Sequence, residues 1–465
     1  MSAFGFKHRY VATLIVLAFL CLPTVHAKSK PVLSDYVIDR YGIPPMVPEG
    51  PLSESLRRAV RGVFVSSLAP IGSVSRLIWG QEQSKALAEI VAAKDPRVAW
   101  LVSDMLRFTW EEEMIDDLTA AATHLLGKEW SEGDPWVEIT DHLIAWDIPA
   151  YPDYLKTKRA MFTNFQYGWE NLFVEGVIDW RLVSWGGVPI DNRAYDTTDT
   201  LCSCIPAIDN PQVSSAEEAT WLKDSDIVFG IEVNGEYRAY PRRIMEVREM
   251  VNDTLGGRDL GIPYCTLCGA AQAYFTDKLP NGIERPVLRT SGLLIRSNKV
   301  MFDINTYSIF DTFLGKAVTG PLADIGLQLQ QATVITTDWG TWKSTYPKTT
   351  VLVEAHALGR NFDFRNGRDA NGPIFPVGDV DPRLPVHEDV IGAITESGKP
   401  VAFPRAIAYL ALSDGQEIVF ENVRLVLDAG GIRTEGNDGS NVTSHQAFWF
   451  AWSQFYPATE LWSAR

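Results

Sequence analysis

The sequence predicts an α+β protein in which an N-terminal all-helical module is followed by a duplicated β-rich body with few helices. Three observations support this prediction. Apolar residues recur at helical spacing in the first part of the chain. From about residue 178, Gly, Pro, Asn and Asp separate short runs of Val, Ile, Tyr and Phe, which is typical of strands and turns. Two sequence patterns then occur twice in the same order.

The composition is that of an ordinary folded protein. The chain has 465 residues, which suggests more than one domain, and it is 46% hydrophobic and 22% charged. The formal net charge of -16 argues against nucleic-acid binding, which requires a basic patch. We therefore expect no nucleic-acid partner.

The first 27 residues have the three-part pattern of a secretory signal peptide. A basic segment at 7–9 precedes an apolar run at 11–22, and Val25 and Ala27 occupy the two positions that a signal peptidase reads. We therefore predict that residues 1–27 are a signal peptide and that the protein is periplasmic or secreted. The apolar run is shorter than the roughly 20 residues of a membrane helix, so we expect no stable membrane span after cleavage.

Residues 50–175 are predicted to form the helical module. Apolar side chains recur three and four residues apart in 52–64. Asp95-Pro96 and Asp134-Pro135 each place a capping Asp before a Pro at the first helical position. No catalytic motif stands out in this module, so we expect it to serve packing or to bind an unknown protein partner.

The β-rich part contains a clear hairpin and two repeated patterns. Residues 227–231 and 236–240 flank an Asn-Gly turn and are predicted to form a β-hairpin. The letters V-F-G and A-Y-P-R within 228–242 resemble V-I-G and A-F-P-R within 390–405, and W-x-x-W-x-x-x-Y-P-x-T starts at Trp339 and again at Trp449. We therefore predict an internal repeat, with residues 178–355 as a cysteine-bearing lobe and residues 356–465 as its shortened second copy.

Four cysteines beyond the signal peptide lie in two close pairs, Cys202-x-Cys204 and Cys265-x-x-Cys268. Four thiols are too few for a disulfide scaffold in a chain of this length, so their clustering indicates a site. A C-x-x-C motif brings two sulfurs within reach of a disulfide bond or of one metal ion. Together the four thiolates would suit a tetrahedral soft-metal centre, with Zn or Cu as the candidate ions.

The chain resembles a bacterial family that is catalogued only as domain-of-unknown-function family 3179. The motifs that carry the resemblance include C-I-P-A-I-D-N-P from Cys204, Y-C-T-L-C-G from Tyr264, S-G-L-L from Ser291 and G-P-L from Gly320. The resemblance covers roughly residues 178–465. It implies an exported bacterial protein, and it brings no established reaction.

Two positions depart from the pattern of that family. Thr266 stands in the cysteine motif where the family usually has Pro, and Arg248 stands where the family tends to have His. If that His contributes to a shared site, this chain lacks the ligand or base that it would supply.

The cysteine pairs leave three functions open. The first is binding of a soft metal ion through the thiolates of Cys202, Cys204, Cys265 and Cys268. The second is thiol–disulfide oxidoreductase activity, with Cys265 as the nucleophile and Cys268 as the resolving thiol. The third is a non-enzymatic scaffold that binds partners and in which the cysteines form structural disulfides.

Other candidate groups have simpler interpretations. Glu249 and Asp253 precede the cysteine strand and are expected to take part in ordinary ion pairs. The histidines, His445 among them, are expected to be core or surface residues. The sequence contains no C-x-x-C-H, P-loop, G-x-G-x-x-G or H-E-x-x-H motif, so it offers no sign of covalent haem, nucleotide or metalloprotease chemistry.

Overall fold

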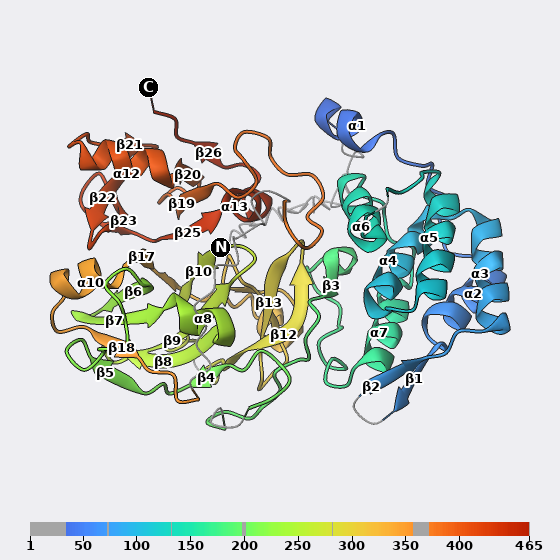
Figure 1. Cartoon of the computed structure of the whole chain (residues 1–465), viewed down its shortest axis with the longest axis horizontal. Helices are drawn as coiled ribbons and strands as arrows, with labels where there is room; N and C mark the ends of the chain where they lie inside the picture. The colour runs from blue at the N-terminus through green and yellow to red at the C-terminus, as the bar shows by residue number, and fades with distance from the viewer. Residues whose placement is uncertain are drawn as a thin grey trace, which may run out of the picture.

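The computed structural model describes residues 34–71, 74–131, 133–197, 201–280, 282–356 and 372–464 (Figure 1). The predicted signal peptide lies outside these ranges and stays a prediction. Among the described residues, no helix combines the length and the apolar character needed to cross a membrane.

The N-terminal part is mainly helical and forms a separate stack of helices beside the β-rich part (Figure 1). Its helices are α1 (Asp35–Tyr41), α2 (Glu54–Phe64), α3 (Gln81–Ala93), η1 (Pro96–Val98), α4 (Ala99–Phe108), α5 (Glu112–Leu126), α6 (Pro135–Ala145) and α7 (Tyr154–Phe165). A hairpin of β1 (Leu68–Ile71) and β2 (Val74–Leu77) interrupts them. The prediction that this module is all-helical is therefore wrong.

Local capping explains where several of these helices begin. The Ser53 hydroxyl accepts a hydrogen bond from the backbone N–H of Leu56 at 3.2 Å, at the start of α2. Asp95 and Asp134 cap η1 and α6, each before a Pro at the first helical position, as the sequence predicts.

The C-terminal part consists of five small sheets, mostly antiparallel, that form a five-bladed β-propeller. The first has the order β16 (Gln331–Ala332), β11 (Ala273–Phe275), β9 (Arg258–Cys265), β8 (Met250–Leu255), β4 (Ile208–Asp209), and β10 (Ala270–Ala271) also pairs with β9. The second has the order β15 (Lys316–Ala317), β14 (Ile309–Asp311), β13 (Asn298–Asp303), β12 (Leu288–Ile295), β3 (Val183–Trp185).

The other three sheets complete the body. Their orders are β17 (Ile335–Asp338), β6 (Ile227–Val233), β7 (Glu236–Pro241), β18 (Thr350–Leu352), β5 (Val213–Ser215); then β25 (Ser444–Phe448), β19 (Asp389–Ile394), β20 (Pro400–Pro404), β26 (Glu460–Leu461); and β21 (Val419–Phe420), β22 (Val423–Asp428), β23 (Gly431–Gly436), β24 (Asn441–Val442). Short helices connect them, namely η2 (Trp180–Leu182), α8 (Arg242–Arg248), α9 (Gly320–Asp324), α10 (Trp339–Thr345), α12 (Arg405–Ser413) and α13 (Trp449–Phe455). The predicted hairpin is confirmed as β6–β7.

The predicted fold class is wrong, because the body is a five-sheet propeller and not two copies of one lobe. The repeated patterns fall in two single sheets, which share the strand orders β17-β6-β7-β18 and β25-β19-β20-β26. In these sheets Gly230 and Gly392 lie under Trp342 and Trp452, and an added Cβ would come within 2.2 Å of either ring. The repeated sequence patterns therefore reflect the packing of a tryptophan on a glycine within one sheet. Such packing does not require a duplicated lobe.

The helical part packs directly against the second sheet. One hydrophobic core cluster joins residues of α2–α7 to Leu293, Val300 and Phe302 of β12 and β13. The buried Lys158 ammonium of α7 forms an ion pair with Asp104 at 3.0 Å and donates to the carbonyl oxygen of Val183 in β3 at 2.5 Å. The domain boundaries at 50–175, 178–355 and 356–465 stay predictions.

Candidate functional site

The C-x-x-C motif forms the turn between β9 and β10. Cys265 is the last residue of β9 and pairs across the ladder with Ala270, and the backbone N–H of Cys268 donates to the Cys265 carbonyl at 3.2 Å. Gly269 has a left-handed φ of 61°, which glycine adopts without strain and which lets the chain reverse. The two cysteines form a disulfide; Cys265 is 2% exposed and Cys268 is fully buried.

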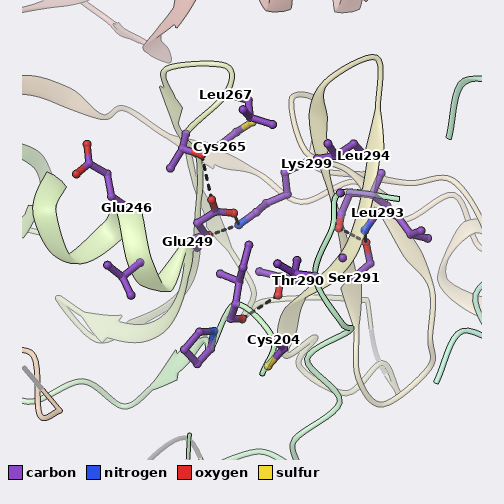
Figure 2. Close-up of a pocket in the computed structure, with 18 of the residues that line it drawn as sticks. Cys204, Glu246, Glu249, Cys265, Leu267, Thr290, Ser291, Leu293, Leu294 and Lys299 are labelled. Carbon is purple, nitrogen blue, oxygen red and sulfur yellow. Dashed lines mark hydrogen bonds and ion pairs between the residues drawn. The ribbon is translucent and has the colours of Figure 1, made fainter. Parts of the chain in front are cut away.

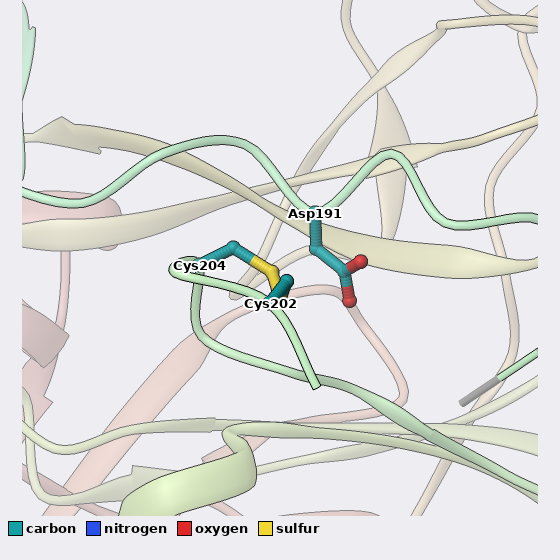
Figure 3. A group of neighbouring side chains, drawn as sticks. All are labelled: Asp191, Cys202 and Cys204. Carbon is teal, nitrogen blue, oxygen red and sulfur yellow. A yellow bond between two sulfur atoms is a disulfide. The ribbon is translucent and has the colours of Figure 1, made fainter. Parts of the chain in front are cut away.

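The second pair, Cys202 and Cys204, is also closed into a disulfide and lies beside the buried carboxylate of Asp191 (Figure 3). One ligand atom from each of these three residues lies within 4.8 Å of the others, which is close enough to hold a metal ion. Within the part of the chain that the structure describes, neither Cys265 nor Cys268 belongs to this group.

The Asp191 carboxylate is already fully engaged by hydrogen bonds. Its Oδ1 accepts from the Arg193 Nε at 2.8 Å, and its Oδ2 accepts from the Arg193 Nη2 at 2.7 Å and from the backbone N–H of Ala207 at 3.0 Å. The Arg289 guanidinium lies 3.8 Å from the same oxygen. A metal ion would compete with two cations for this carboxylate, and the disulfide sulfurs carry no thiolate charge to offer it.

Both cysteine pairs contribute to the wall of one cavity of about 560 Å³. Cys202 and Cys204 line one part of it, and Cys265 lines another. Figure 2 shows Cys265 in the upper part and Cys204 in the lower part of the close-up, with Glu249 and Thr290 between them in this view. The structure thus brings the two pairs to the same cavity without bringing their sulfurs to one point. The assignment of all four as ligands of one ion stays a prediction.

Between the cysteine pairs the cavity wall carries a buried ion pair. The Lys299 ammonium lies 2.9 Å from the Glu249 carboxylate and donates to the Glu249 carbonyl oxygen at 2.5 Å. Burial lowers the pKa of the Lys299 ammonium, and the charge of Glu249 partly opposes this effect. The hydroxyl of Thr266, inside the C-x-x-C motif, donates to the other Glu249 oxygen at 3.1 Å. The motif is thereby linked to a charged pair on the cavity wall.

The two departures from the family pattern have different consequences. Thr266, in place of the usual Pro, supplies the hydroxyl that contacts Glu249. Arg248 does not line the cavity; it forms a buried ion pair with Glu354 at 2.6 Å and donates to the Pro206 carbonyl at 3.2 Å. A histidine at this position would lack the permanent charge and the several N–H donors with which arginine contacts both Glu354 and the Pro206 carbonyl.

Sequence reasoning missed two residues that the structure places at the site. Asp191 precedes the cysteines by more than ten positions and carries no motif. Lys299 lies 50 residues from Glu249, and in a strand whose residues are all buried a lysine gives no local signal of its partner. The expected ion pairs of Glu249 and Asp253 are confirmed, with Lys299 and Arg238 as their respective partners.

Comparison with known proteins gives one family and nothing further. Residues 202–431 match the family described as "Protein of unknown function (DUF3179)". This confirms the resemblance over a segment that contains all four cysteines of the two pairs. No curated protein and no solved structure gives a significant match to the chain.

Proposed function

We propose that this chain, which resembles a family of unknown function over residues 202–431, is a thiol–disulfide oxidoreductase acting through Cys265 and Cys268. The proposal depends on one observation: Cys265 lines a cavity of about 560 Å³, while its bonded partner Cys268 is fully buried and does not line it. Cys265 is therefore the cysteine of this disulfide that a small thiol in the cavity would meet. This is the asymmetry that separates an attacked sulfur from a resolving one.

The exchange can be written with atoms and electrons in balance. A substrate thiolate attacks the Cys265 sulfur, the Cys265–Cys268 bond breaks, and Cys268 leaves as a thiolate that takes up a proton. A second substrate thiol then attacks the substrate sulfur of the mixed disulfide, and Cys265 leaves with the second proton. Two substrate thiols become one disulfide, and the protein disulfide gains two electrons and becomes a dithiol. The reverse sequence reduces a substrate disulfide.

The charged pair beside the motif supports this chemistry. A thiolate is stabilised by nearby donors and cations, and Lys299 and Thr266 are such groups on the wall of the same cavity. Because burial lowers the pKa of Lys299, its ammonium gives up a proton more readily than an exposed lysine would. We assign Lys299 and Glu249 a role in holding the proton that moves between the thiols.

The redox potential of the Cys265–Cys268 pair tests the proposal. The protein is equilibrated in glutathione buffers, its free thiols are trapped with a maleimide, and each pair is read by mass spectrometry of its peptide. We expect a potential between about -120 and -270 mV, the range of thiol–disulfide catalysts. The variant Cys268→Ser should form a mixed disulfide with glutathione at Cys265.

A potential below about -300 mV for this pair, with no mixed disulfide in Cys268→Ser, would identify a structural disulfide and overturn the proposal. The double variant Cys202→Ser/Cys204→Ser is the matched control, because it removes the other disulfide. Its Cys265–Cys268 potential should equal that of the unmodified protein.

A second candidate function is metal binding at Asp191, Cys202 and Cys204, favoured by the closeness of their ligand atoms. It requires reduction of the disulfide, since thiolates are the ligands that soft ions such as Zn or Cu prefer. Asp191 would also have to give up a hydrogen bond from Arg193. These two requirements place it second.

Calorimetric titration of Zn²⁺ into reduced and oxidised protein tests this candidate. Binding only to the reduced form, and its loss in Asp191→Asn and in Cys202→Ser, would support it. Equal binding by both forms, or unchanged binding by the variants, would contradict it.

We also propose that the protein is exported to the periplasm or secreted. Two disulfides fit such a compartment, because reducing conditions in the cytosol keep thiols free. The test is fractionation of cells that produce the full chain or a chain lacking residues 2–27, with the expectation that only the full chain leaves the cytosol.

A further inference from the structure

We infer that a second cavity, beside the Cys202–Cys204 disulfide, binds an extended cysteine-containing peptide segment that carries aromatic and basic residues. This inference rests on the proposed function, because it assigns the same exchange chemistry to the second disulfide and names its substrate class. The cavity has a volume of about 890 Å³ and includes Cys202, Ser203 and Cys204 in its lining. We call it the aromatic groove.

The position of the disulfide is the first argument. Cys202 and Cys204 belong to the lining of both the aromatic groove and the cavity that contains Cys265. Cys204 is only 9% exposed, and Cys202 is the more accessible of the two. A thiol that enters the groove therefore meets Cys202 first.

The segment that follows the disulfide is anchored on both sides of Ala207. The backbone N–H of Ala207 donates to the Asp191 carboxylate, and the Ala207 carbonyl oxygen accepts from the Arg193 Nη2 at 3.0 Å. This anchoring limits how far Cys204 can move when the disulfide opens, so the resolving sulfur stays beside the attacked one.

The walls of the groove are the second argument. Six aromatic side chains from the helical part and from β3 line it: Trp79, Phe108, Trp110, Phe165, Tyr167 and Trp185. Phe108 and Phe165 stack with ring centroids 3.8 Å apart, and Trp185 meets Phe165 edge-on at 4.8 Å. Such walls bind apolar and aromatic side chains well, because each ring offers a large contact area.

Large side chains at the groove remain in contact with water. Trp110 is 74% exposed and Tyr167 is 58% exposed, and both line the groove. Apolar surface of this kind, gathered around a reactive pair, is typical of a binding site. An aromatic side chain of a peptide would cover it.

The charge of the groove lining favours a basic occupant. Glu111 and Glu113 line the groove, and among the described residues its lining includes no lysine or arginine. A basic residue in the occupant would therefore meet complementary charge, and an acidic one would be repelled. Gln166 adds a neutral polar side chain to the lining of the groove.

These features together favour a peptide over a small aromatic compound. The proposed step begins when a peptide thiolate attacks the Cys202 sulfur and Cys204 leaves as a thiolate that takes up the proton of the peptide thiol. A second thiol of the same peptide then attacks the peptide sulfur and releases Cys202 with the second proton. The peptide is oxidised to a disulfide by two electrons, and the protein pair is reduced to a dithiol.

The test uses full-length Cys204→Ser protein, in which Cys202 is a free thiol. The probe is a ten-residue peptide with one cysteine, two tryptophans and two lysines, activated as a mixed disulfide with thionitrobenzoate. Attack by Cys202 joins the peptide to the protein and releases the coloured thiolate, whose appearance gives the rate. Matched peptides replace the lysines with glutamates or the tryptophans with serines.

We expect the basic aromatic peptide to react at least about tenfold faster than either matched peptide, a difference of about 1.4 kcal/mol. Trp110→Ala and Tyr167→Ala should lower its rate to that of the serine peptide. Both side chains are mostly exposed, so neither substitution should unfold the protein. The matched control is Trp221→Ala, which removes an aromatic side chain that is 37% exposed and does not line the groove.

Equal rates for the three peptides, with normal reaction of Cys202 toward a small activated disulfide, would overturn the inference and leave the proposed function intact. A dimer in solution that Trp110→Ala converts to a monomer would overturn it as well, because the groove would then hold a second copy of the chain. Failure of the proposed function is read separately, from the potential of the Cys265–Cys268 pair, which the groove variants should not change.

Discussion

Lys299 is an ion-paired lysine in a strand whose residues are all buried. The side chains of Lys299 and Glu249 are 5% and 12% exposed, so each depends on the other for its charge to be tolerated. Replacing only one of them leaves an uncompensated buried charge, whereas replacing both does not. The pair therefore offers a test of its contribution to stability that is separate from any role in catalysis.

We predict that Lys299→Met lowers the free energy of unfolding by about 3–5 kcal/mol, because the Glu249 carboxylate then lacks its cation. The double variant Lys299→Met/Glu249→Gln should recover a large part of this loss. Urea denaturation measures both. A single variant as stable as the double variant would contradict the prediction.

His445 shows that a buried histidine need not be a ligand. It is 3% exposed, and its ring nitrogens lie near the side-chain nitrogens of Gln331 at 2.9 Å and Gln272 at 3.4 Å. Burial lowers its pKa from 6.5 to about 3. The ring is therefore neutral in the folded protein, as expected of a core histidine.

This pKa shift predicts a dependence of stability on pH. Between about pH 6.5 and pH 3 the unfolded chain binds a proton at His445 that the folded chain does not, so stability falls as the pH falls. The slope from this one group approaches about 1.4 kcal/mol per pH unit. His445→Gln should lose this contribution, and urea denaturation at several pH values checks it. Parallel pH profiles for the two proteins would contradict the prediction.

Among the elements, the sheets that contain β6 and β19 share a contact between a glycine and a tryptophan. The Trp342 and Trp452 indoles are fully buried or nearly so, and each donates through its Nε1 to the hydroxyl of Thr349 or Thr459, at 2.9 and 3.0 Å. This hydrogen bond and burial hold the indole in place, and a Cβ on the glycine beneath it would overlap the ring.

We predict that Gly392→Ala destabilises the protein by at least about 1–3 kcal/mol, because the new methyl group would overlap the Trp452 ring. The matched control is Gly62→Ala in α2, where the added Cβ would meet Ala86 at an ordinary 3.6 Å. That change should be neutral or stabilising by up to about 1 kcal/mol. Thermal denaturation distinguishes the two, and equal effects would contradict the argument.

At the scale of the whole molecule, the helical part and the propeller share a core. One hydrophobic cluster runs from α2 to β13, and within it Lys158 joins Asp104 in α4 to the Val183 carbonyl in β3. Burial raises the pKa of Asp104 to about 6, and the charge of Lys158 opposes this shift. The junction is thus held by both apolar contacts and a buried ion pair.

We therefore predict that the full chain unfolds in one cooperative transition. Scanning calorimetry should give a single peak whose van't Hoff and calorimetric enthalpies agree. Lys158→Met should lower the transition temperature, since it leaves the Asp104 carboxyl without its cation. Two separate peaks for the unmodified protein would show that the helical part is an independent folding unit.

The sequence by itself determined the features that depend on neighbouring residues. Asp95 and Asp134 mark helix starts because a cap acts within three residues, and the Asn-Gly turn defines the β6–β7 hairpin for the same reason. The closeness within each cysteine pair also follows from its spacing.

Only the tertiary structure decided the number of sheets and the composition of the site. The ladders that pair Leu293 with Trp185 and Ile208 with Val251 join strands far apart in sequence, and no periodicity encodes such pairings. The same long-range pairing places Lys299 beside Glu249, and it brings Arg289 to Asp191 next to the Cys202–Cys204 disulfide. Local sequence patterns specify a helix or strand and its exposed or buried face. Which strands pair and which side chains meet depends on how the whole chain packs into one core.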